Sequence, residues 1–215
     1  MKSRGIQLRD LTYKYADTPV LDRFSIDVEQ TKIQVITGAN GSGKTTLLKI
    51  MSTLIEAQSG EIKIAGYCAR TEPYRVRQSV SCAFVNTRGL FPNLSVRENT
   101  LLYARMHGMG TDEIKTGLKR VECLIADKMD LMPRELSTGM RQCVQLAKAF
   151  LRSTPVYLLD EPYLSLDESR IILVNEIIHG LCADGRTVML SAQNAHAHLL
   201  PQSHCLSDLN LRLVG

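Results

Sequence analysis

A glycine-rich stretch between residues 38 and 45 carries the most specific chemical pattern in the sequence. It reads Gly-Ala-Asn-Gly-Ser-Gly-Lys-Thr, which is a complete G-x-x-x-x-G-K-[ST] motif. Glycines let the backbone adopt positive φ angles and approach a ligand without a Cβ in the way, so successive N–H groups can converge on an anion. Lys44 adds an ammonium group and Thr45 offers a hydroxyl to Mg²⁺. The stretch therefore predicts a phosphate loop that binds a nucleoside triphosphate.

The residues around this loop predict the secondary structure that such a loop needs. An apolar run over residues 33–37 precedes it and predicts a buried strand, and a helical pattern over 45–55 follows it. The positive end of that helix adds to the attraction for phosphate. The residues that we expect to bind the nucleotide are Gly38, Ala39, Asn40, Gly41, Ser42, Gly43, Lys44, Thr45 and Thr46.

Two adjacent acids end a second apolar run, over residues 156–159. Asp160 at the end of such a strand can hold Mg²⁺ together with Thr45, whereas Glu161 can act on the water that attacks the γ-phosphate. Pro162 forces the chain to turn directly after them, which allows the two carboxylates to face different partners. A lone Asp-Glu pair is also a common solvated strand end, but the phosphate loop in the same chain favours the catalytic interpretation.

The composition is that of a globular domain and argues against several classes of partner. Hydrophobic residues make up 44% of the 215-residue chain, which is ample for a buried core. The 26 basic and 22 acidic residues give a net charge of +4 without a long run of one sign, so we expect no nucleic acid partner. No stretch approaches the roughly 18 apolar residues of a membrane span. Six cysteines without a C-x-x-C pair predict reduced thiols in a cytosol-like compartment.

Hydrophobic periodicity predicts an α/β chain. The expected strands are residues 6–11, 25–28, 33–37, 61–65, 80–85, 156–160 and 187–192. The expected helices are 45–55, 95–107, 111–127, 138–151 and 168–182, and a Ser95-x-x-Glu98 capping box begins the second of them. Because the late strands must rejoin the phosphate-loop sheet, residues from about 92 to 152 are expected to form a helical lobe within a single domain, 1–215.

The segment at residues 136–142 precedes the acidic strand and reads Leu-Ser-Thr-Gly-Met-Arg-Gln. By itself, Ser137 is a good helix N-cap. In this position, however, the segment resembles the signature motif of ATP-binding cassette (ABC) ATPases, whose usual form is Leu-Ser-Gly-Gly-Gln. Leu136, Ser137 and Gly139 match that form, whereas Thr138 and Met140 depart from it.

This resemblance covers nearly the whole chain and implies a fold. The implied fold is an α/β P-loop NTPase cassette with a mixed or parallel core sheet, an N-terminal antiparallel β-subdomain and a helical lobe. In the family an aromatic residue stacks on adenine, and Tyr15 has the matching position, with Tyr13 as a competitor. The segment at 164–167 resembles the D-loop of the family.

The resemblance also implies how the site is completed. Cassette ATPases work as head-to-tail pairs, so Ser137 and the N–H groups around Gly139 of a second subunit are expected to bind the γ-phosphate at a helix N-terminus. We therefore expect ATP and Mg²⁺ as cofactors. The expected assembly is a homodimer, or a heterodimer with a second cassette.

Other positions depart from the family pattern. Asn86 aligns with the glutamine that contacts Mg²⁺, and Gln193 aligns with the switch histidine. An amide at 193 can hydrogen-bond the γ-phosphate but cannot take up a proton, so turnover is expected to be slow. If the loop after the last strand shifts by three residues, His196 could take the place of the missing switch histidine.

A late group of potential zinc ligands fits surface loops better than a metal site; it comprises His196, His198, His204 and Cys205.

Together these patterns predict the ATP-hydrolysing subunit of an export-type ABC transporter, peripheral on the cytoplasmic face of a membrane and paired with a separate transmembrane permease. The sequence resembles cassettes of drug and polysaccharide exporters and the haem-export subunit of cytochrome c maturation. Two alternatives stay open. One is an ATP-gated dimerising module that scarcely hydrolyses, and the other is a soluble cassette ATPase outside transport, for example in iron–sulfur assembly.

Overall fold

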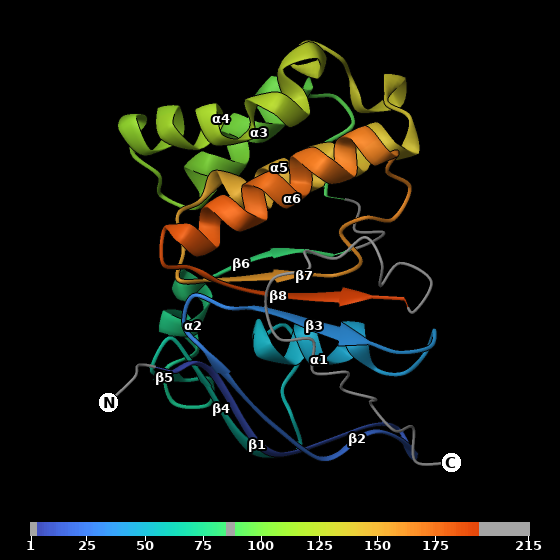
Figure 1. The fold of residues 1–215 in the computed structure, drawn as a ribbon, viewed down its shortest axis with the longest axis vertical. Coiled ribbons are helices and arrows are strands. Elements are labelled where there is room, and N and C mark those ends of the chain that lie inside the picture. Colours follow the sequence, from blue (N-terminus) through green and yellow to red (C-terminus); the bar gives the residue numbers. More distant parts are fainter. Residues whose placement is uncertain (1–3, 85–88, 194–215) are drawn as a thin grey trace. The chain divides into compact units, whose positions relative to one another are not determined.

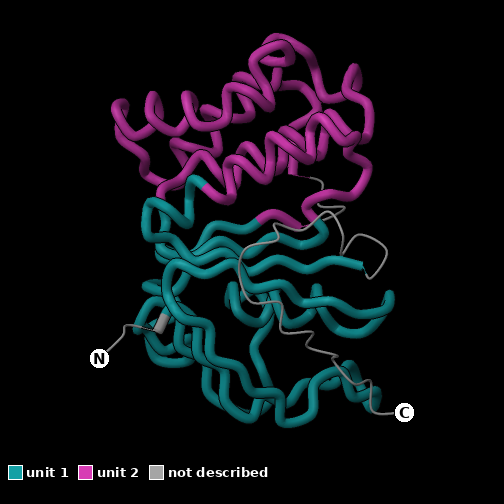
Figure 2. The backbone as a smooth tube through the Cα atoms, in the orientation of Figure 1, with its two compact units in different colours: residues 1–82, 154–161, 180–215 teal, residues 83–153, 162–179 magenta. Residues whose placement is uncertain are grey.

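The computed structural model describes residues 4–84 and 89–193 (Figure 1). The chain divides into two compact units (Figure 2). Unit 1 comprises residues 1–82, 154–161 and 180–215, and unit 2 comprises residues 83–153 and 162–179. The single domain over 1–215 and the limits of its helical lobe remain predictions.

Unit 1 is built on two four-stranded sheets. The first has the order β2-β1-β4-β5 and is formed by β1 (Arg4–Tyr15), β2 (Thr18–Glu29), β4 (Ser59–Ile64) and β5 (Tyr67–Cys68), which pair antiparallel. The second has the order β3-β8-β7-β6 and is formed by β3 (Ile33–Thr37), β6 (Val80–Ala83), β7 (Val156–Leu159) and β8 (Thr187–Ala192). β8 pairs in parallel with both β3 and β7. The predicted fold class, with a parallel core sheet and an antiparallel β-subdomain, is confirmed.

Three strands of the parallel sheet are buried on both faces. Every residue of β3, β7 and β8 is buried. Burial on both faces is what makes these strands read as continuous apolar runs in the sequence. Thr37 of β3 is aligned with Ala192 of β8, and Leu159 of β7 with Leu190. The segments that follow the three strands therefore begin at one edge of the sheet.

The antiparallel sheet departs from the prediction in the length of its first hairpin. β1 and β2 have 12 residues each, whereas short strands at 6–11 and 25–28 were expected. The pairing of β1 with β2 shifts register between Leu8 and Leu11 and again before Tyr13. Each shift interrupts the alternation of apolar and polar residues that identifies a half-buried strand. The outer halves of these strands were therefore missed.

Two short helices lie entirely within unit 1. α1 (Lys44–Met51) begins where the phosphate loop ends, and its inward residues, among them Leu47, Leu48 and Ile50, are buried. α2 (Pro73–Ser79) begins with a proline in its first turn. The sequence did not predict α2 or β5, because seven-residue and two-residue elements are too short to show a period.

Unit 2 is helical. It contains α3 (Val96–Met106), α4 (Thr111–Ile125), α5 (Thr138–Leu151), most of α6 (Glu168–Ala183) and two 3₁₀ turns, η1 (Ala126–Lys128) and η2 (Pro133–Glu135). The capping box of α3 is confirmed, since Ser95 Oγ accepts from Glu98 N and Glu98 Oε2 accepts from Ser95 N. At Gly117 of α4 an added Cβ would lie 2.3 Å from the carbonyl oxygen of Leu151. A side chain there would push α4 away from α5.

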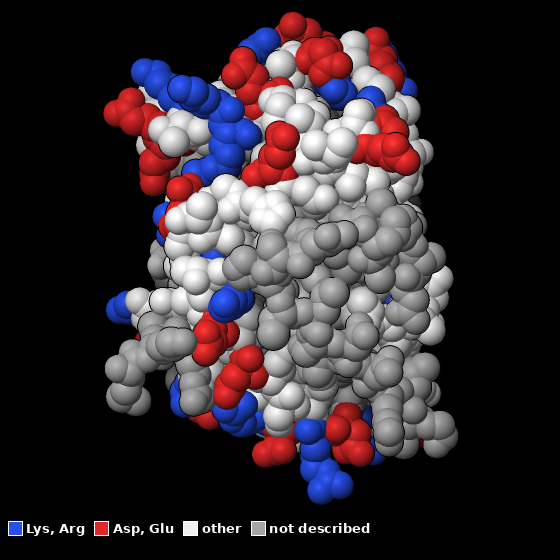
Figure 3. Space-filling view, in the orientation of Figure 1, with Lys and Arg blue, Asp and Glu red and all other residues white. Residues whose placement is uncertain are grey.

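Charged side chains of both signs are interspersed on the face shown in Figure 3. Among the described residues, surface ion pairs join Arg97 with Asp130 and Arg170 with Asp167. Within the described residues, none of the helices combines the length and the apolar character needed to cross a membrane.

Candidate active site

The phosphate loop connects β3 to α1 in unit 1. Gly41 and Gly43 have φ angles of 82° and 89°, which L-residues with a side chain adopt at a cost. Gly43 also caps α1, and a Cβ at this position would lie 2.7 Å from Cγ1 of Val20 in β2. Both constraints require glycine. The loop backbone is therefore shaped by the spacing of the motif, as the sequence predicted.

Two polar side chains of the loop are buried and fit a phosphate group. Lys44 is 5% exposed, and its Nζ donates to the carbonyl oxygens of Gly38 and Ala39 at 2.8 and 3.0 Å. The Oγ of Ser42 is buried and has no hydrogen-bond partner among the described residues. Burying an unpaired hydroxyl costs about 1–3 kcal/mol. A phosphate oxygen is an acceptor of the kind that this hydroxyl and the Lys44 ammonium can both use.

Asp160 follows β7 and is bound by hydroxyl groups from two other segments. Thr45 Oγ1 donates to Asp160 Oδ2 at 2.8 Å, and Ser191 Oγ donates to Asp160 Oδ1 at 2.7 Å. Asp160 is 3% exposed. A buried carboxylate beside the loop threonine is the arrangement that holds Mg²⁺ in P-loop proteins, where phosphates and water complete the shell. The residues predicted to hold the metal, Thr45 and Asp160, are thus brought together.

Glu161 is fixed by its backbone as well as its side chain. It has a φ angle of 44°, which lies in the left-handed region and is uncommon for a residue with a side chain. Its N–H donates to Ser191 Oγ at 2.9 Å. The carboxylates of Glu161 and Asp160 have different partners: Gln193 donates to Glu161, whereas Thr45 and Ser191 donate to Asp160.

Gln193 contacts Glu161 in this structure. Its Nε2 donates to Glu161 Oε2 at 2.8 Å. The sequence predicted a role for the amide at the γ-phosphate, and the described contact is with the predicted catalytic carboxylate instead. An amide can orient that carboxylate but cannot exchange a proton with it at neutral pH.

Sequence reasoning missed Ser191, the residue that joins these groups. It is fully buried in β8, donates to Asp160 and accepts from Glu161 N. The signal was a single hydroxyl near the end of an otherwise apolar strand, Thr-Val-Met-Leu-Ser-Ala. A buried polar residue of this kind needs a partner, and here the partners, Asp160 and Glu161, lie 31 and 30 residues earlier in the chain.

Tyr15 lies at the end of β1, close to the start of α1. Tyr15 is 48% exposed, and its ring packs edge-on against that of Tyr13 at 5.0 Å between ring centroids. Its hydroxyl oxygen lies 3.5 Å from Oγ1 of Thr46. Of the two candidate tyrosines, Tyr15 is therefore the one in contact with the helix that follows the phosphate loop, and its role in adenine stacking remains a prediction.

The signature segment belongs to unit 2. Ser137 is the N-cap of α5, and its Oγ accepts from Met140 N at 3.2 Å. At Gly139 an added Cβ would lie 2.5 Å from the carbonyl oxygen of Ser165. Both residues thus have a structural role within one chain, and their predicted contact with a phosphate of a second subunit is a separate expectation.

Several predicted residues lie outside the described part of the chain. One is Asn86, the third predicted ligand of Mg²⁺. The others are the late group of potential zinc ligands, His196, His198, His204 and Cys205. Within the described residues, no three His, Cys, Asp or Glu side chains are grouped to hold a metal ion.

Comparison with known proteins decides the family. The sequence profile of the ABC transporter family matches residues 21–164. The chain belongs to the ABC transporter ATPase family. It is 32% identical over 190 residues to the cytochrome c biogenesis ATP-binding export protein CcmA of Xanthomonas campestris, covering 88% of this chain and 86% of that protein. The resemblance to ABC ATPases seen in the sequence is confirmed.

Other relatives show how wide the family is. The xylose/arabinose import ATP-binding protein XacJ of Haloferax volcanii is 36% identical over 171 residues, covering 75% of this chain and 43% of that protein. A solved structure described as the ATP-binding subunit of an ABC transporter matches with a TM-score of 0.80 and 28% identity, over 88% of this chain and 79% of that one. Since import and export proteins both occur among the relatives, they establish an ATP-binding ABC ATPase and leave the direction of transport open.

Proposed function

We propose that this chain hydrolyses ATP as the cassette subunit of an export-type ABC transporter, on the cytoplasmic face of a membrane and with a separate permease. The observation that carries the proposal is one set of hydrogen bonds in unit 1. It joins Thr45, Asp160, Glu161, Ser191 and Gln193. Three segments that are distant in the sequence contribute to it. Export is favoured by the similarity to CcmA along most of both chains.

Nucleotide binding is assigned to the phosphate loop. The loop N–H groups and the buried Lys44 ammonium bind the β- and γ-phosphates, and the Ser42 hydroxyl gains a partner. Thr45 and Asp160 hold Mg²⁺, which when bound neutralises phosphate charge. Because both oxygens of Asp160 already accept hydroxyl hydrogen bonds, its carboxylate is held in position.

Hydrolysis is assigned to Glu161. Ser191 fixes its backbone and Gln193 fixes its carboxylate, so the carboxylate is oriented to accept a proton from the attacking water. The second subunit supplies Ser137 and the N–H groups near Gly139, at the start of α5. ATP is then bound between two subunits.

A pair of variants tests this assignment. Glu161→Gln keeps the shape and the hydrogen-bonding length of the side chain but removes the base. We expect phosphate release to fall by roughly 100-fold or more, while ATP binding persists and the variant accumulates as a dimer with ATP. The matched control is Glu168→Gln, at the exposed first turn of α6, which should release phosphate at the normal rate. Normal turnover in Glu161→Gln would exclude Glu161 as the base.

The permease is proposed to bind a groove in unit 2. A cavity of about 990 Å³ is lined by residues that include Phe91, Arg134 and Arg141. Phe91 is 53% exposed, which is unusual for a large apolar side chain, and the two arginines favour an acidic partner. We expect a cytoplasmic helix of the permease with an apolar and an acidic face to fill this groove.

Substitution of Phe91 tests the groove. Phe91→Ser should weaken co-purification with the permease and leave ATP affinity unchanged. Met106→Ser removes an apolar side chain that is 71% exposed on α3 and does not line the groove, so it serves as the control. Equal co-purification of the Phe91 variant and the wild type would place the permease elsewhere.

A second function, an ATP-gated dimer with little hydrolysis, is favoured by Gln193. Histidine at this position could take up a proton during turnover, whereas the amide that contacts Glu161 cannot. Phosphate release measured with the permease in proteoliposomes separates the two functions. Turnover of about 1 s⁻¹ or more, within the ordinary range of enzymes, supports a transport ATPase, and dimerisation without release supports the gated module.

A further inference from the structure

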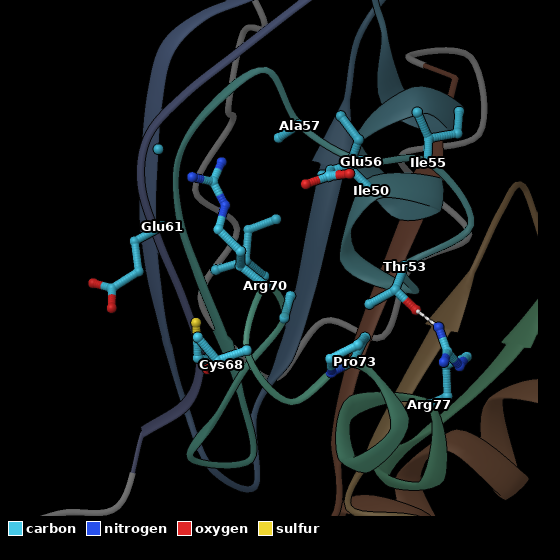
Figure 4. A pocket seen from close by; sticks show the side chains of 14 residues that line it. Ile50, Thr53, Ile55, Glu56, Ala57, Glu61, Cys68, Arg70, Pro73 and Arg77 are labelled. Carbon is cyan, nitrogen blue, oxygen red and sulfur yellow. Dashed lines mark hydrogen bonds between the residues drawn. The ribbon is translucent and has the colours of Figure 1, made fainter.

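A second cavity in unit 1 is not used by the proposed ATPase mechanism. It has a volume of about 480 Å³ and lies between the C-terminal end of α1, β4 and the segment from β5 to α2 (Figure 4). Cavities of 300–1,000 Å³ with apolar walls and a few polar groups are typical of small-molecule sites. The phosphate loop does not contribute to its lining.

The inner wall of this cavity is apolar. It is lined by Ile50 of α1, by Ala57 in the segment before β4 and by Ile62 of β4, and their exposed fractions are only 1%, 8% and 8%. Ile55 and Ala69 extend the same wall. An apolar body placed against these side chains would be removed from water, which is favourable in proportion to the apolar area covered.

Four charged side chains line the cavity, and two of them already have partners. Arg77 donates to Thr53 Oγ1 at 3.1 Å, and Glu61 forms an ion pair with Lys63 at 2.7 Å. Figure 4 shows Glu61 pointing away from the cavity.

The other two charged side chains, Arg70 and Glu56, face each other across the cavity in Figure 4. Neither forms an ion pair or a side-chain hydrogen bond with another described residue. A cation and an anion on opposite sides of an apolar wall can bind the two ends of one ligand.

We propose that this cavity binds a small apolar zwitterion, with the ligand carboxylate at Arg70, the ligand ammonium at Glu56 and the apolar body against Ile50 and Ile62. Arg70 offers planar paired N–H donors that match a carboxylate. Glu56 accepts from an ammonium group. Free apolar amino acids and short apolar peptides share this chemistry. The site is a second ligand site and does not depend on the proposed ATPase function.

Cys68 supplies a reporter for this site. It lines the cavity, and its thiol accepts hydrogen bonds from the side chain and the N–H of Thr71 and from the N–H of Arg70, which lower its pKa. Cys123 in α4 is exposed overall, but partial desolvation of its thiol raises the pKa of that thiol; it belongs to unit 2 and does not line the cavity. Thiolates react with alkylating agents and thiols do not. We therefore expect Cys68 to react with iodoacetamide faster than Cys123 does, and a ligand in the cavity to shield it.

The experiment measures the alkylation rate of each cysteine in the whole protein by peptide mass spectrometry. Leucine and the dipeptide Leu-Leu are the two probes, and N-acetyl-leucyl-leucinamide, which lacks both charges, is the control compound. At saturation one of the two probes should slow alkylation of Cys68 severalfold, because the bound probe covers the thiol, and should leave the alkylation rate of Cys123 unchanged. The probe that protects distinguishes an amino acid from a peptide as the ligand.

Two variants test the charged contacts. Arg70→Gln and Glu56→Gln should each abolish protection, with each rate compared to that of the same variant without probe. Arg75→Gln is the matched control, because Arg75 pairs with Glu72 and lies over the ring of Tyr67 without lining the cavity. The proposal is overturned if neither probe slows alkylation of Cys68, or if a probe slows Cys68 and Cys123 equally. It is also overturned if the uncharged compound protects Cys68, or if protection is unchanged in the Arg70 and Glu56 variants.

Discussion

In unit 1, five polar residues from three distant segments are joined by hydrogen bonds, whereas in unit 2 Ser137 and Gly139 serve the start of one helix. Asp160 and Glu161 are each held by side chains from other strands or loops. Ser137 caps α5, and Gly139 lets a neighbouring turn approach closely. The polar side chains of unit 1 are therefore held by one another, and their predicted ligand is ATP. In unit 2, by contrast, Ser137 and Gly139 already have a structural role within one chain.

This contrast predicts the largest effect at Lys44. Lys44→Met keeps the apolar stem of the side chain and removes its buried ammonium, so the fold should persist while ATP affinity falls by roughly 100-fold. Isothermal titration with ATP and Mg²⁺ measures the loss. Lys49→Met, in the last turn of the same helix, is the control and should bind ATP normally. Similar ATP affinities of Lys44→Met and Lys49→Met would contradict the assignment of ATP binding to the phosphate loop of unit 1.

Ser191→Ala tests whether the hydrogen bonds of unit 1 act as one set. The substitution leaves Glu161 N–H and Asp160 Oδ1 each without this partner. We expect turnover to fall about tenfold, because Glu161 is no longer held in the productive geometry, and the unfolding free energy to fall by about 1–3 kcal/mol. Steady-state phosphate release and urea unfolding measure the two effects. Ser169→Ala, an exposed residue that donates to Asp167, should leave turnover unchanged.

In unit 2 the corresponding test concerns stability without any nucleotide. Gly139→Ala places a Cβ 2.5 Å from a backbone oxygen and should lower the unfolding free energy by about 1–3 kcal/mol. The comparison variant is Gly180→Ala in α6, at a residue that belongs to unit 1. Its added Cβ meets nothing within 4 Å, so the substitution should raise the unfolding free energy by about 0.5–1 kcal/mol. Urea unfolding of the two variants compares them directly. Equal stability of Gly139→Ala and the wild type would show that this glycine is kept for the ligand alone.

The smallest expected effect concerns Gln193 and its contact with Glu161. Gln193→His introduces a side chain whose ordinary pKa is about 6.5, so turnover should rise about two- to fivefold and become pH-dependent between about pH 6 and 8. The wild type, with an amide at this position, should have a flatter profile over the same range. A pH profile of phosphate release shows the difference. Identical profiles would mean that position 193 does not act on Glu161 during turnover.

Local patterns in the sequence were sufficient to predict the phosphate loop, the adjacent acids and the capping box of α3. In each case the residues that interact are close in sequence or follow a buried apolar run. Ser191 could not be predicted, because its partners come from another strand and only the sheet register brings them together. The cavity beside Arg70 was missed for the same reason, since separate segments form it. The length of the first hairpin was missed because register shifts disturb the alternation of its side chains.

The left-handed backbone conformation of Glu161 affects which substitutions would stabilise the protein. A residue with a side chain in this conformation costs on the order of 1–2 kcal/mol, and glycine avoids that cost. A search for stabilising substitutions would therefore select glycine at 161 and discard the residue proposed as the base. Stability and activity oppose each other at this one position. Thermostable variants of this chain should be sought elsewhere, for example at Gly180 in α6, where the two properties are not coupled.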